Sequence, residues 1–207
     1  MKNKLKQITI NIFGKIYFYL KTGSLSYELD KLVKSGAVTV SRHSYGKPSV
    51  YWYKNDAKLF IGNFTSIAKN VSIHLGGIHP LDWVSTFPFR IIWDLPGAYQ
   101  DGTPATKGDI KIGSDVWIGF GVTIVSGITI GDGAALLPHS MITKDVPPYA
   151  VVGGNPAKVI KKRFPDDIIE ELLKIKWWNW DDEKINKFTP LLCNENIDDF
   201  IKAALEI

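Results

Sequence analysis

The sequence predicts a mainly β fold, a parallel β-helix of hexapeptide repeats with one excursion loop and terminal α-helices. Aliphatic residues recur at every sixth position, a period that neither an α-helix nor a single β-strand produces. Such a repeat is typical of a hexapeptide solenoid, in which each hexad forms one short strand and one turn. The repeat stops over residues 75–109, which predicts an excursion from the coils. The residues in phase are Ile61, Ile67, Ile73, Ile112, Ile118, Ile124, Ile130, Leu136 and Ile142.

Composition places the chain among globular proteins. The 207 residues are 45% hydrophobic and 22% charged, which suits one sizeable core with a small appendage. The net charge of +4 comes without the clustered basic residues that nucleic-acid binding requires, so we expect no nucleic-acid partner. Because the chain has one cysteine, it forms no intrachain disulfide, and a cytoplasmic location is expected.

Residues 1–36 are interpreted as an N-terminal capping segment. The first twenty residues combine lysines with apolar residues, but Lys15 interrupts the apolar run and no cleavage site for a signal peptide follows. An amphipathic segment resting on an anionic membrane surface is one interpretation. A helix that packs on its own domain or on a neighbouring subunit is favoured over it.

Residues 37–160 are predicted to form the β-helix, with one or two irregular coils before Ile61. Glycines such as Gly119 and Gly133 fit tight corners, where a larger residue would be excluded. Most aliphatic positions are followed four places later by a smaller or β-branched residue that we also expect to face inward. These second positions are Val71, Val116, Val122, Ile128, Ala134, Ser140 and Val146.

Residues 161–207 are predicted to form a C-terminal helical cap. Pro165 suits the first turn of a helix that extends over residues 165–180, and acidic residues follow it near the positive end of the helix dipole. A last helix is expected to begin after Asn196, a residue type that caps helices. Cys193 is interpreted as a buried structural thiol and as a poor nucleophile.

Three motifs resemble those of the hexapeptide-repeat acyltransferases, and within them the xenobiotic acetyltransferases and related O-acetyltransferases. They are "DWVSTFPF" in the loop, "TKGDIKIGSDVWIG" where the coils resume, and "TKDVPPYAVVGGNPAKVI" at the end, within a similarity that extends over residues 38–180. The resemblance implies a homotrimer of left-handed β-helices. It also implies that acetyl-CoA lies in a groove between two subunits, and that the loop of one subunit reaches the active site.

The loop histidine of that family corresponds to His79. Members usually read Gly-Gly-Asn-His-Arg, whereas this chain has Ile78 before the histidine and Pro80 after it. Acetyl transfer from a thioester to a hydroxyl needs a base, and an imidazole, with an ordinary pKa of about 6.5, suits that role near neutral pH. His79 is therefore the predicted general base.

Three further residues complete the predicted catalytic set and its surroundings. Asp82 orients the imidazole, binds the acceptor, or instead caps a short helix. The resemblance places the backbone N–H donors for the developing oxyanion at the "DVWIG" corner, at Trp117 and Phe120. The reaction requires no metal.

The resemblance also implies which residues bind acetyl-CoA. Lysines suit its phosphates as point charges, and this role is favoured over the alternative that Lys158, Lys161, Lys162 and Arg163 are a solvated basic run. Members usually have small residues where this chain has Pro138 and His139. The predicted cofactor-binding residues are Trp117, Phe120, Pro138, Thr143, Lys144, Lys158 and Lys161.

The predicted function is acetyl transfer from acetyl-CoA to a hydroxyl, or an amine, of a sugar in cell-envelope polysaccharide or nucleotide-sugar metabolism. The alternative acceptor is an antibiotic of the chloramphenicol or streptogramin type. A zinc hydratase of the γ-carbonic anhydrase type is a remote alternative, because His74 and His79 have a spacing that such sites use. A non-catalytic binding protein on the same solenoid is a third interpretation, and the loop histidine disfavours it.

Overall fold

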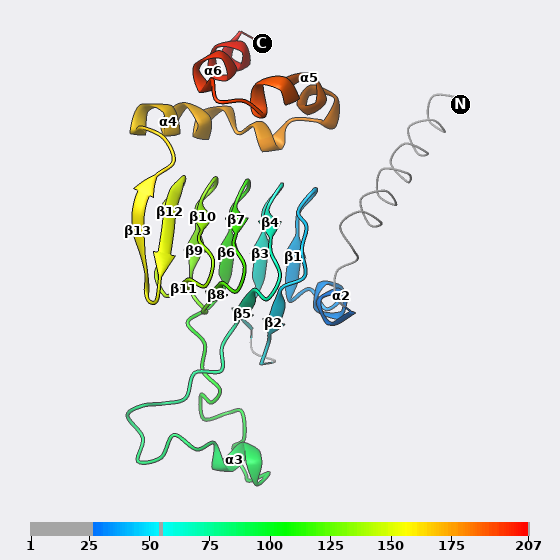
Figure 1. Ribbon diagram of the computed structural model, residues 1–207. Helices are drawn as coiled ribbons and strands as arrows, with labels where there is room; N and C mark the ends of the chain where they lie inside the picture. The colour runs from blue at the N-terminus through cyan, green and yellow to red at the C-terminus, as the bar shows by residue number, and fades with distance from the viewer. Residues whose placement is uncertain (1–26, 54–55, 207) are drawn as a thin grey trace, which may run out of the picture.

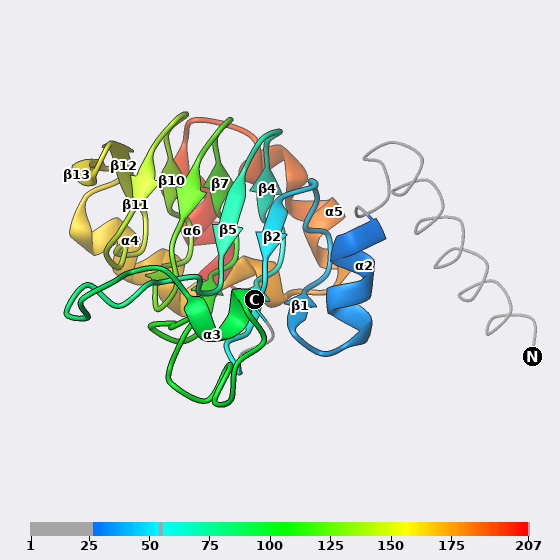
Figure 2. The same cartoon turned by 90° about the horizontal axis from the view of Figure 1, so that it is seen from below.

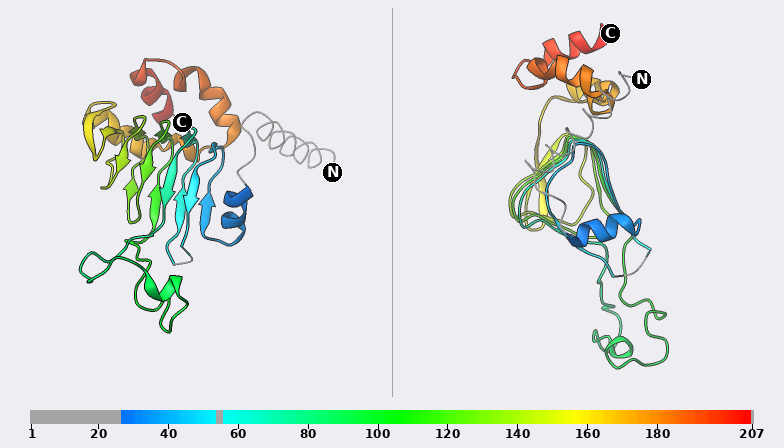
Figure 3. Two further views of the ribbon diagram at one scale, coloured as in Figure 1. Left: turned by 60° about the horizontal axis from the view of Figure 1, so that its bottom comes forward. Right: turned by 90° about the vertical axis from the view of Figure 1, so that its right-hand side faces the viewer.

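A computed structural model describes residues 27–53 and 56–206, and its strands stack as successive coils with a triangular cross-section (Figures 1 and 3). Strands β2 to β8 each pair in parallel with the strand three elements later, so three sheets run along the solenoid. Sheet A comprises β1 (Val38–Val40), β3 (Leu59–Ile61), β6 (Ile110–Ile112) and β9 (Thr129–Ile130). Sheet B comprises β4 (Ser66–Ile67), β7 (Trp117–Ile118), β10 (Ala135–Leu136), β12 (Ala150–Gly154) and β13 (Ala157–Lys162). Sheet C comprises β2 (Ser49–Tyr51), β5 (Ser72–His74), β8 (Thr123–Ile124) and β11 (Met141–Ile142).

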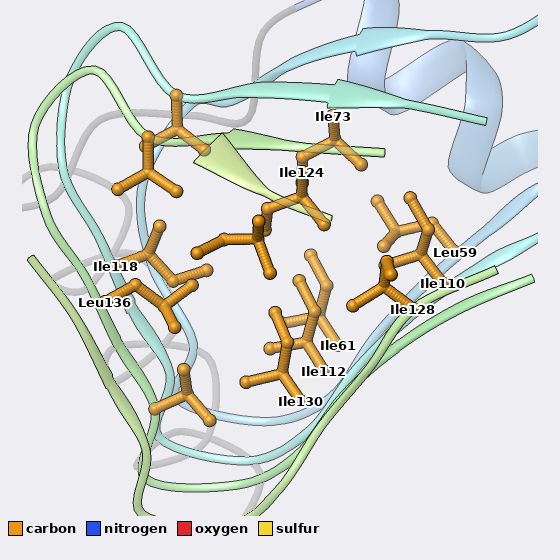
Figure 4. Packing of buried hydrophobic residues seen from close by; sticks show 14 of the residues in the cluster. Leu59, Ile61, Ile73, Ile110, Ile112, Ile118, Ile124, Ile128, Ile130 and Leu136 are labelled. Carbon is orange, nitrogen blue, oxygen red and sulfur yellow. The ribbon is translucent and has the colours of Figure 1, made fainter. Parts of the chain in front are cut away.

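The six-residue repeat forms the interior of this triangle. All nine predicted aliphatic positions are buried, and so are the seven predicted second positions. Figure 4 shows equivalent side chains stacked from coil to coil, such as Ile61, Ile112 and Ile130. These contacts confirm the predicted inward-facing set. Burial of one such aliphatic side chain contributes about 1.5–3 kcal/mol.

The three corners of the triangle position the functional residues. Corner AB, between sheets A and B, contains residues 62–64, 113–115, 131–133 and 147–149. Corner BC contains residues 119–121 and 137–139. Corner CA contains residues 143–145 and the loop 75–109.

Glycines fit these corners for two different reasons. A Cβ on Gly119 would lie 2.7 Å from the backbone nitrogen of Pro138 in the next coil, so close backbone approach requires glycine there. Gly133 has a φ of +69°, and a Cβ would also lie 2.5 Å from the ring of Tyr149. Both glycines were predicted as corner residues.

One coil precedes Ile61, formed by β1, a bridge at Tyr45 and β2. The helix α2 (Tyr27–Lys34) covers its open end, with Leu29 buried against the core. Residues 1–26, which include the segment considered for membrane contact, lie outside the described residues. Among the residues that are described, none of the helices combines the length and the apolar character needed to cross a bilayer.

The last coil ends in an antiparallel hairpin. After β12 the chain turns back, and β13 pairs with β12 at the edge of sheet B. Paired prolines and glycines were predicted to end the solenoid here. Because β13 ends at Lys162, strand pairing continues two residues beyond residue 160, the predicted end of the β-helix.

The C-terminal helices differ from the predicted cap because they lie along corner AB instead of closing the last coil (Figure 3). They reach back to the first coil, where Arg42 donates to the carbonyl of Trp178. The predicted helix at 165–180 is shorter, since Lys176 adopts a left-handed conformation that ends it. The elements are α4 (Asp166–Ile175), η1 (Trp177–Asn179), α5 (Asp182–Leu192) and α6 (Ile197–Leu205).

Two details of these helices bear on the sequence predictions. Asn196 caps α6 as expected, because its side chain accepts from the N–H of Asp199. The helix α5 was not predicted, and Pro190 within it weakened the helical pattern. Cys193, expected to be buried, is exposed because it follows the end of α5.

Candidate active site

The excursion loop leaves the solenoid at corner CA and extends away from the coils (Figures 1 and 2). Its two ends are joined by backbone hydrogen bonds between Ile78 and Ala105, of 3.1 and 2.9 Å. Gly77 precedes this neck with a φ of +83°, and a Cβ there would lie 2.5 Å from the ring of Tyr53. The neck therefore fixes the chain directly before His79.

His79 is exposed, and a hydrogen bond inside the loop orients it. Its Nδ1 lies 2.6 Å from the backbone carbonyl oxygen of Thr86. A carbonyl only accepts hydrogen bonds, so Nδ1 carries the proton. This assignment leaves the lone pair of Nε2 free, which is the atom that a general base would use.

No hydrogen bond or ion pair joins Asp82 to His79 or to any other residue that the structure describes. Asp82 is exposed, and its segment bends without forming the short helix that Asp82 might have capped. The carbonyl of Thr86 holds the imidazole instead. Residue type could not have identified this partner, because every residue carries a backbone carbonyl.

The loop also encloses a pocket of about 360 Å³. Ser85 and Phe87, which flank Thr86, both line it, so the pocket lies beside the histidine. Phe87 and Phe89 also line the pocket, with their ring centroids 4.7 Å apart, and the ring of Trp93 packs on Phe89 at 4.8 Å. The Oγ1 atom of Thr103 is buried at the pocket without a partner among the described residues.

Corner BC holds Phe120 and Pro138 in adjacent coils. Both are exposed, and the ring of Phe120 meets the ring of His139 edge to face at 5.3 Å. The N–H of Phe120 has no partner within residues 27–53 and 56–206, so it can donate to an oxyanion. The N–H of Trp117 cannot, because it donates to the carbonyl of Ala134 at 2.9 Å in the strand ladder. The prediction that the Trp117 N–H stabilises the oxyanion is therefore wrong. The side chain of Trp117 is exposed and remains available for binding.

Lys158 and Lys161 lie on one face of the terminal hairpin. Three residues apart on a regular strand, they would face opposite ways. A bulge changes this: Lys161 pairs with Val151, and Val152 pairs with Val159, which leaves Ile160 as the extra residue. Lys158 then pairs opposite Gly153, on the same face as Val151.

This face is the outer surface of sheet B, where Trp117 also lies. Across the strands, Val151 is in register with Ala135, and Ala135 is in register with Trp117. The next residues along these strands, Val152, Leu136 and Ile118, are buried in the core. Because side chains alternate along a strand, the row of Val151, Ala135 and Trp117 points outward. Trp117 and Lys161 are separated by three strand spacings, or about 14 Å.

Thr143 and Lys144 lie on a different corner. Both are exposed at corner CA, directly after β11, and share that corner with the neck of the loop. The predicted residues therefore fall into two groups. The first group is Trp117, Phe120, Pro138, Lys158 and Lys161, on sheet B and corner BC; the second group is His79, Asp82, Thr143 and Lys144, at corner CA.

The other histidines have structural surroundings. His74 stacks on Tyr51 at 4.5 Å, and burial lowers the pKa of His74 below its ordinary value. His43 stacks on Phe64 at 4.8 Å and lies 2.9 Å from a carboxylate oxygen of Asp182. Within the described ranges, no three histidine, cysteine or acidic residues gather as a metal site would require.

Comparisons with known proteins identify related acetyltransferases. The sequence profile of the family "Bacterial transferase hexapeptide (six repeats)" matches residues 109–144. A chloramphenicol acetyltransferase from Morganella morganii is 41% identical over 186 residues, which cover 82% of this chain and 88% of that protein. A probable macrolide acetyltransferase from Lysinibacillus sphaericus is 46% identical over 142 residues, or 67% of this chain and 78% of that protein. A virginiamycin A acetyltransferase from Staphylococcus aureus is 45% identical over 145 residues, or 68% of this chain and 65% of that protein.

Proposed function

This chain belongs to the hexapeptide-repeat acyltransferases and is an acetyl-CoA-dependent acetyltransferase, and we propose that it acetylates a hydroxyl group of an antibiotic. The observation that carries the proposed chemistry is the hydrogen bond from His79 Nδ1 to the carbonyl of Thr86. It holds the imidazole in the tautomer whose Nε2 can accept a proton.

In the proposed reaction, His79 Nε2 takes the proton of the acceptor hydroxyl as its oxygen attacks the thioester carbonyl carbon. The Phe120 N–H stabilises the negative charge that develops on the thioester oxygen. When the carbon–sulfur bond breaks, the protonated imidazole returns its proton to the departing sulfur. The products are the acetylated acceptor and free coenzyme A.

An antibiotic acceptor has better support than the sugar acceptor predicted from the sequence. The three relatives described above are named for chloramphenicol, macrolides and virginiamycin. The pocket beside His79 is lined by Trp83, Phe87 and Phe89, which suits the aromatic ring of a compound such as chloramphenicol. We therefore propose chloramphenicol as the first acceptor to test, with sugar hydroxyls as the second class.

We also propose that the site forms between two chains of a trimer of left-handed β-helices. The two groups of site residues lie on different corners of one chain, so a site that uses both groups needs a second chain. The projecting loop carries exposed apolar side chains that a neighbouring subunit would cover, including Leu81 at 89% exposure and Trp93 at 61%.

The test of this function is turnover of chloramphenicol and acetyl-CoA by the His79→Ala variant. Loss of a general base lowers the rate by about 10²–10⁴-fold, whereas acetyl-CoA affinity and the thermal midpoint should stay near those of the parent, since His79 is exposed. His74→Ala is the matched control, and it should retain most activity. If His79→Ala keeps most of its turnover, the proposed mechanism is wrong. If the parent protein transfers acetyl groups only to sugars, the antibiotic acceptor is wrong and the mechanism stands.

A further inference from the structure

The pocket inside the excursion loop carries two charged side chains, Arg90 and Asp101. Arg90 lies on the short helix α3 (Phe89–Ile92), which begins three residues after Thr86, the residue that orients His79 (Figures 1 and 2). Most of the remaining lining is aromatic or aliphatic, and no other lining residue that the structure describes is charged. This ion pair is therefore the feature of the wall that can distinguish one polar acceptor from another.

The two partners of the ion pair differ in how many hydrogen bonds they can still make. Arg90 Nη1 donates to Asp101 Oδ2 at 2.9 Å, and Asp101 Oδ1 accepts the N–H of Thr103 at 3.1 Å. Each carboxylate oxygen of Asp101 thus has a partner, and its side chain is only 16% exposed. A guanidinium has five N–H donors, and in the described part of the chain Asp101 alone accepts from Arg90. Arg90 therefore keeps donors for a ligand.

The guanidinium of Arg90 is both accessible and held in position. Its side chain is 49% exposed, so a molecule in the pocket can reach it. The stem passes beside Gly97, where a Cβ would lie 3.5 Å from Arg90 Cδ, and the N–H of Leu95 donates to the carbonyl of Arg90 at 2.8 Å. Together with the ion pair, these contacts fix the direction in which the free donors point.

The charges of the pair determine what those donors can bind. The carboxylate of Asp101 balances the guanidinium, so an anionic substituent beside Arg90 would be repelled by Asp101 at close range. A cationic substituent would be repelled by Arg90 itself. A neutral group with an exposed oxygen avoids both costs and can accept a charge-assisted hydrogen bond.

We propose that Arg90 determines acceptor specificity by donating a hydrogen bond to a neutral nitro or sulfonyl group at the end of the acceptor remote from the acetylated hydroxyl. This inference rests on the proposed function, which places the acceptor in the loop pocket. The acceptor's aromatic ring lies against Phe87 and Phe89, between Arg90 and His79. Chloramphenicol fits this arrangement, because its nitro group and its hydroxyl-bearing side chain are on opposite sides of its ring.

The test compares chloramphenicol with an analogue that has hydrogen in place of the nitro group. Each is titrated by calorimetry into the full chain with saturating free coenzyme A, which carries no acetyl group and so leaves the acceptor unchanged. We expect the parent to bind chloramphenicol about fivefold more tightly than the analogue, the loss of a hydrogen bond to a half-exposed charged group. In Arg90→Met, which keeps most of the aliphatic stem, the two compounds should bind equally.

Two further variants separate recognition from a structural role. Lys111→Met removes an exposed cation on sheet A and should keep the fivefold preference. Asp101→Asn leaves the guanidinium without its counter-charge, so an analogue with a carboxylate in place of the nitro group should gain affinity relative to chloramphenicol. A loss of loop structure would weaken all the compounds together and would not change these ratios.

The outcomes distinguish this inference from the proposed function. An unchanged preference in Arg90→Met, equal binding of both compounds by the parent, or absence of saturable chloramphenicol binding would each overturn the role of Arg90. Turnover with acetyl-CoA is measured separately. If the parent shows the nitro preference but does not acetylate chloramphenicol, the proposed function is wrong and the role of Arg90 stands. If it acetylates chloramphenicol and Arg90→Met keeps the preference, the reverse holds.

Discussion

At the scale of single residues, corner AB contains the carboxylate of Asp115, whose charged form is disfavoured by partial burial. The Asp115 side chain is 28% exposed and has a left-handed backbone, with a φ of 56°. Burial raises the pKa of Asp115; the attraction of Arg163 opposes this rise without cancelling it, and repulsion from Asp132 adds to it. The folded protein therefore holds the proton of Asp115 more tightly than the unfolded chain does.

This shift predicts a dependence of stability on pH that Asp115→Asn removes. A raised pKa contributes stability that is complete below the unfolded pKa, about 3.9, and that is lost as pH rises through the folded value. Asparagine does not ionise and can still accept from Arg163. The unfolding temperature of the variant, relative to the parent, should therefore rise as pH increases from about 4 to 7. Thermal unfolding across this range checks it, and a constant difference would contradict the assignment.

At the scale of elements, the bulge in the terminal hairpin decides which lysines can act together. It places Lys158 and Lys161 on the outer face of sheet B with Trp117. Lys162 pairs with Ala150 and faces the other way, where it forms an ion pair with Asp166. Arg163 is engaged with Asp115 and Gly133. These four cationic residues therefore differ in their surroundings, although the sequence presents them as one basic run.

This arrangement predicts that single-alanine variants of the hairpin will differ in acetyl-CoA affinity. Lys158→Ala and Lys161→Ala should each weaken binding about tenfold, since a hydrogen bond to a charged group contributes about 1.5–3 kcal/mol before solvent screening at an exposed site reduces it. Lys162→Ala, on the opposite face, is the matched control and should bind normally. Calorimetric titration with coenzyme A gives all three affinities. Equal affinities for the three variants would contradict the proposal that Lys158 and Lys161 bind the phosphates of coenzyme A.

The sequence was informative about elements that repeat and less so about contacts between distant segments. The aliphatic residues of the coils were predicted one by one, because a fixed period tests each position against the others. The orientation of His79 was not, since its partner is the backbone carbonyl of Thr86. The packing of Trp178 near Arg42 in the first coil was also missed, because residues 136 apart in the sequence share no local pattern. The packing of the C-terminal helices along corner AB depends on such contacts.

At the scale of the whole molecule, one chain does not complete the proposed site. The loop with His79 and the pair Thr143–Lys144 lie at corner CA, while Phe120 and Pro138 lie at corner BC. Sheet C separates these corners within a chain. In a ring of three identical chains, corner CA of one chain can face corner BC of the next, and three equivalent sites result.

A shared site predicts that two defective chains restore each other in a mixed trimer. One parent carries His79→Ala, and the other carries Lys158→Ala with Lys161→Ala and is assayed at limiting acetyl-CoA, where it turns over slowly. In any trimer that contains both chains, one of the three interfaces joins an intact loop to an intact groove. Trimers purified through a different affinity tag on each chain should therefore show roughly a third of the parent turnover. Sedimentation verifies that they are trimers. If the mixed trimers are no more active than the two variants alone, loop and groove act within one chain, and the shared site is excluded.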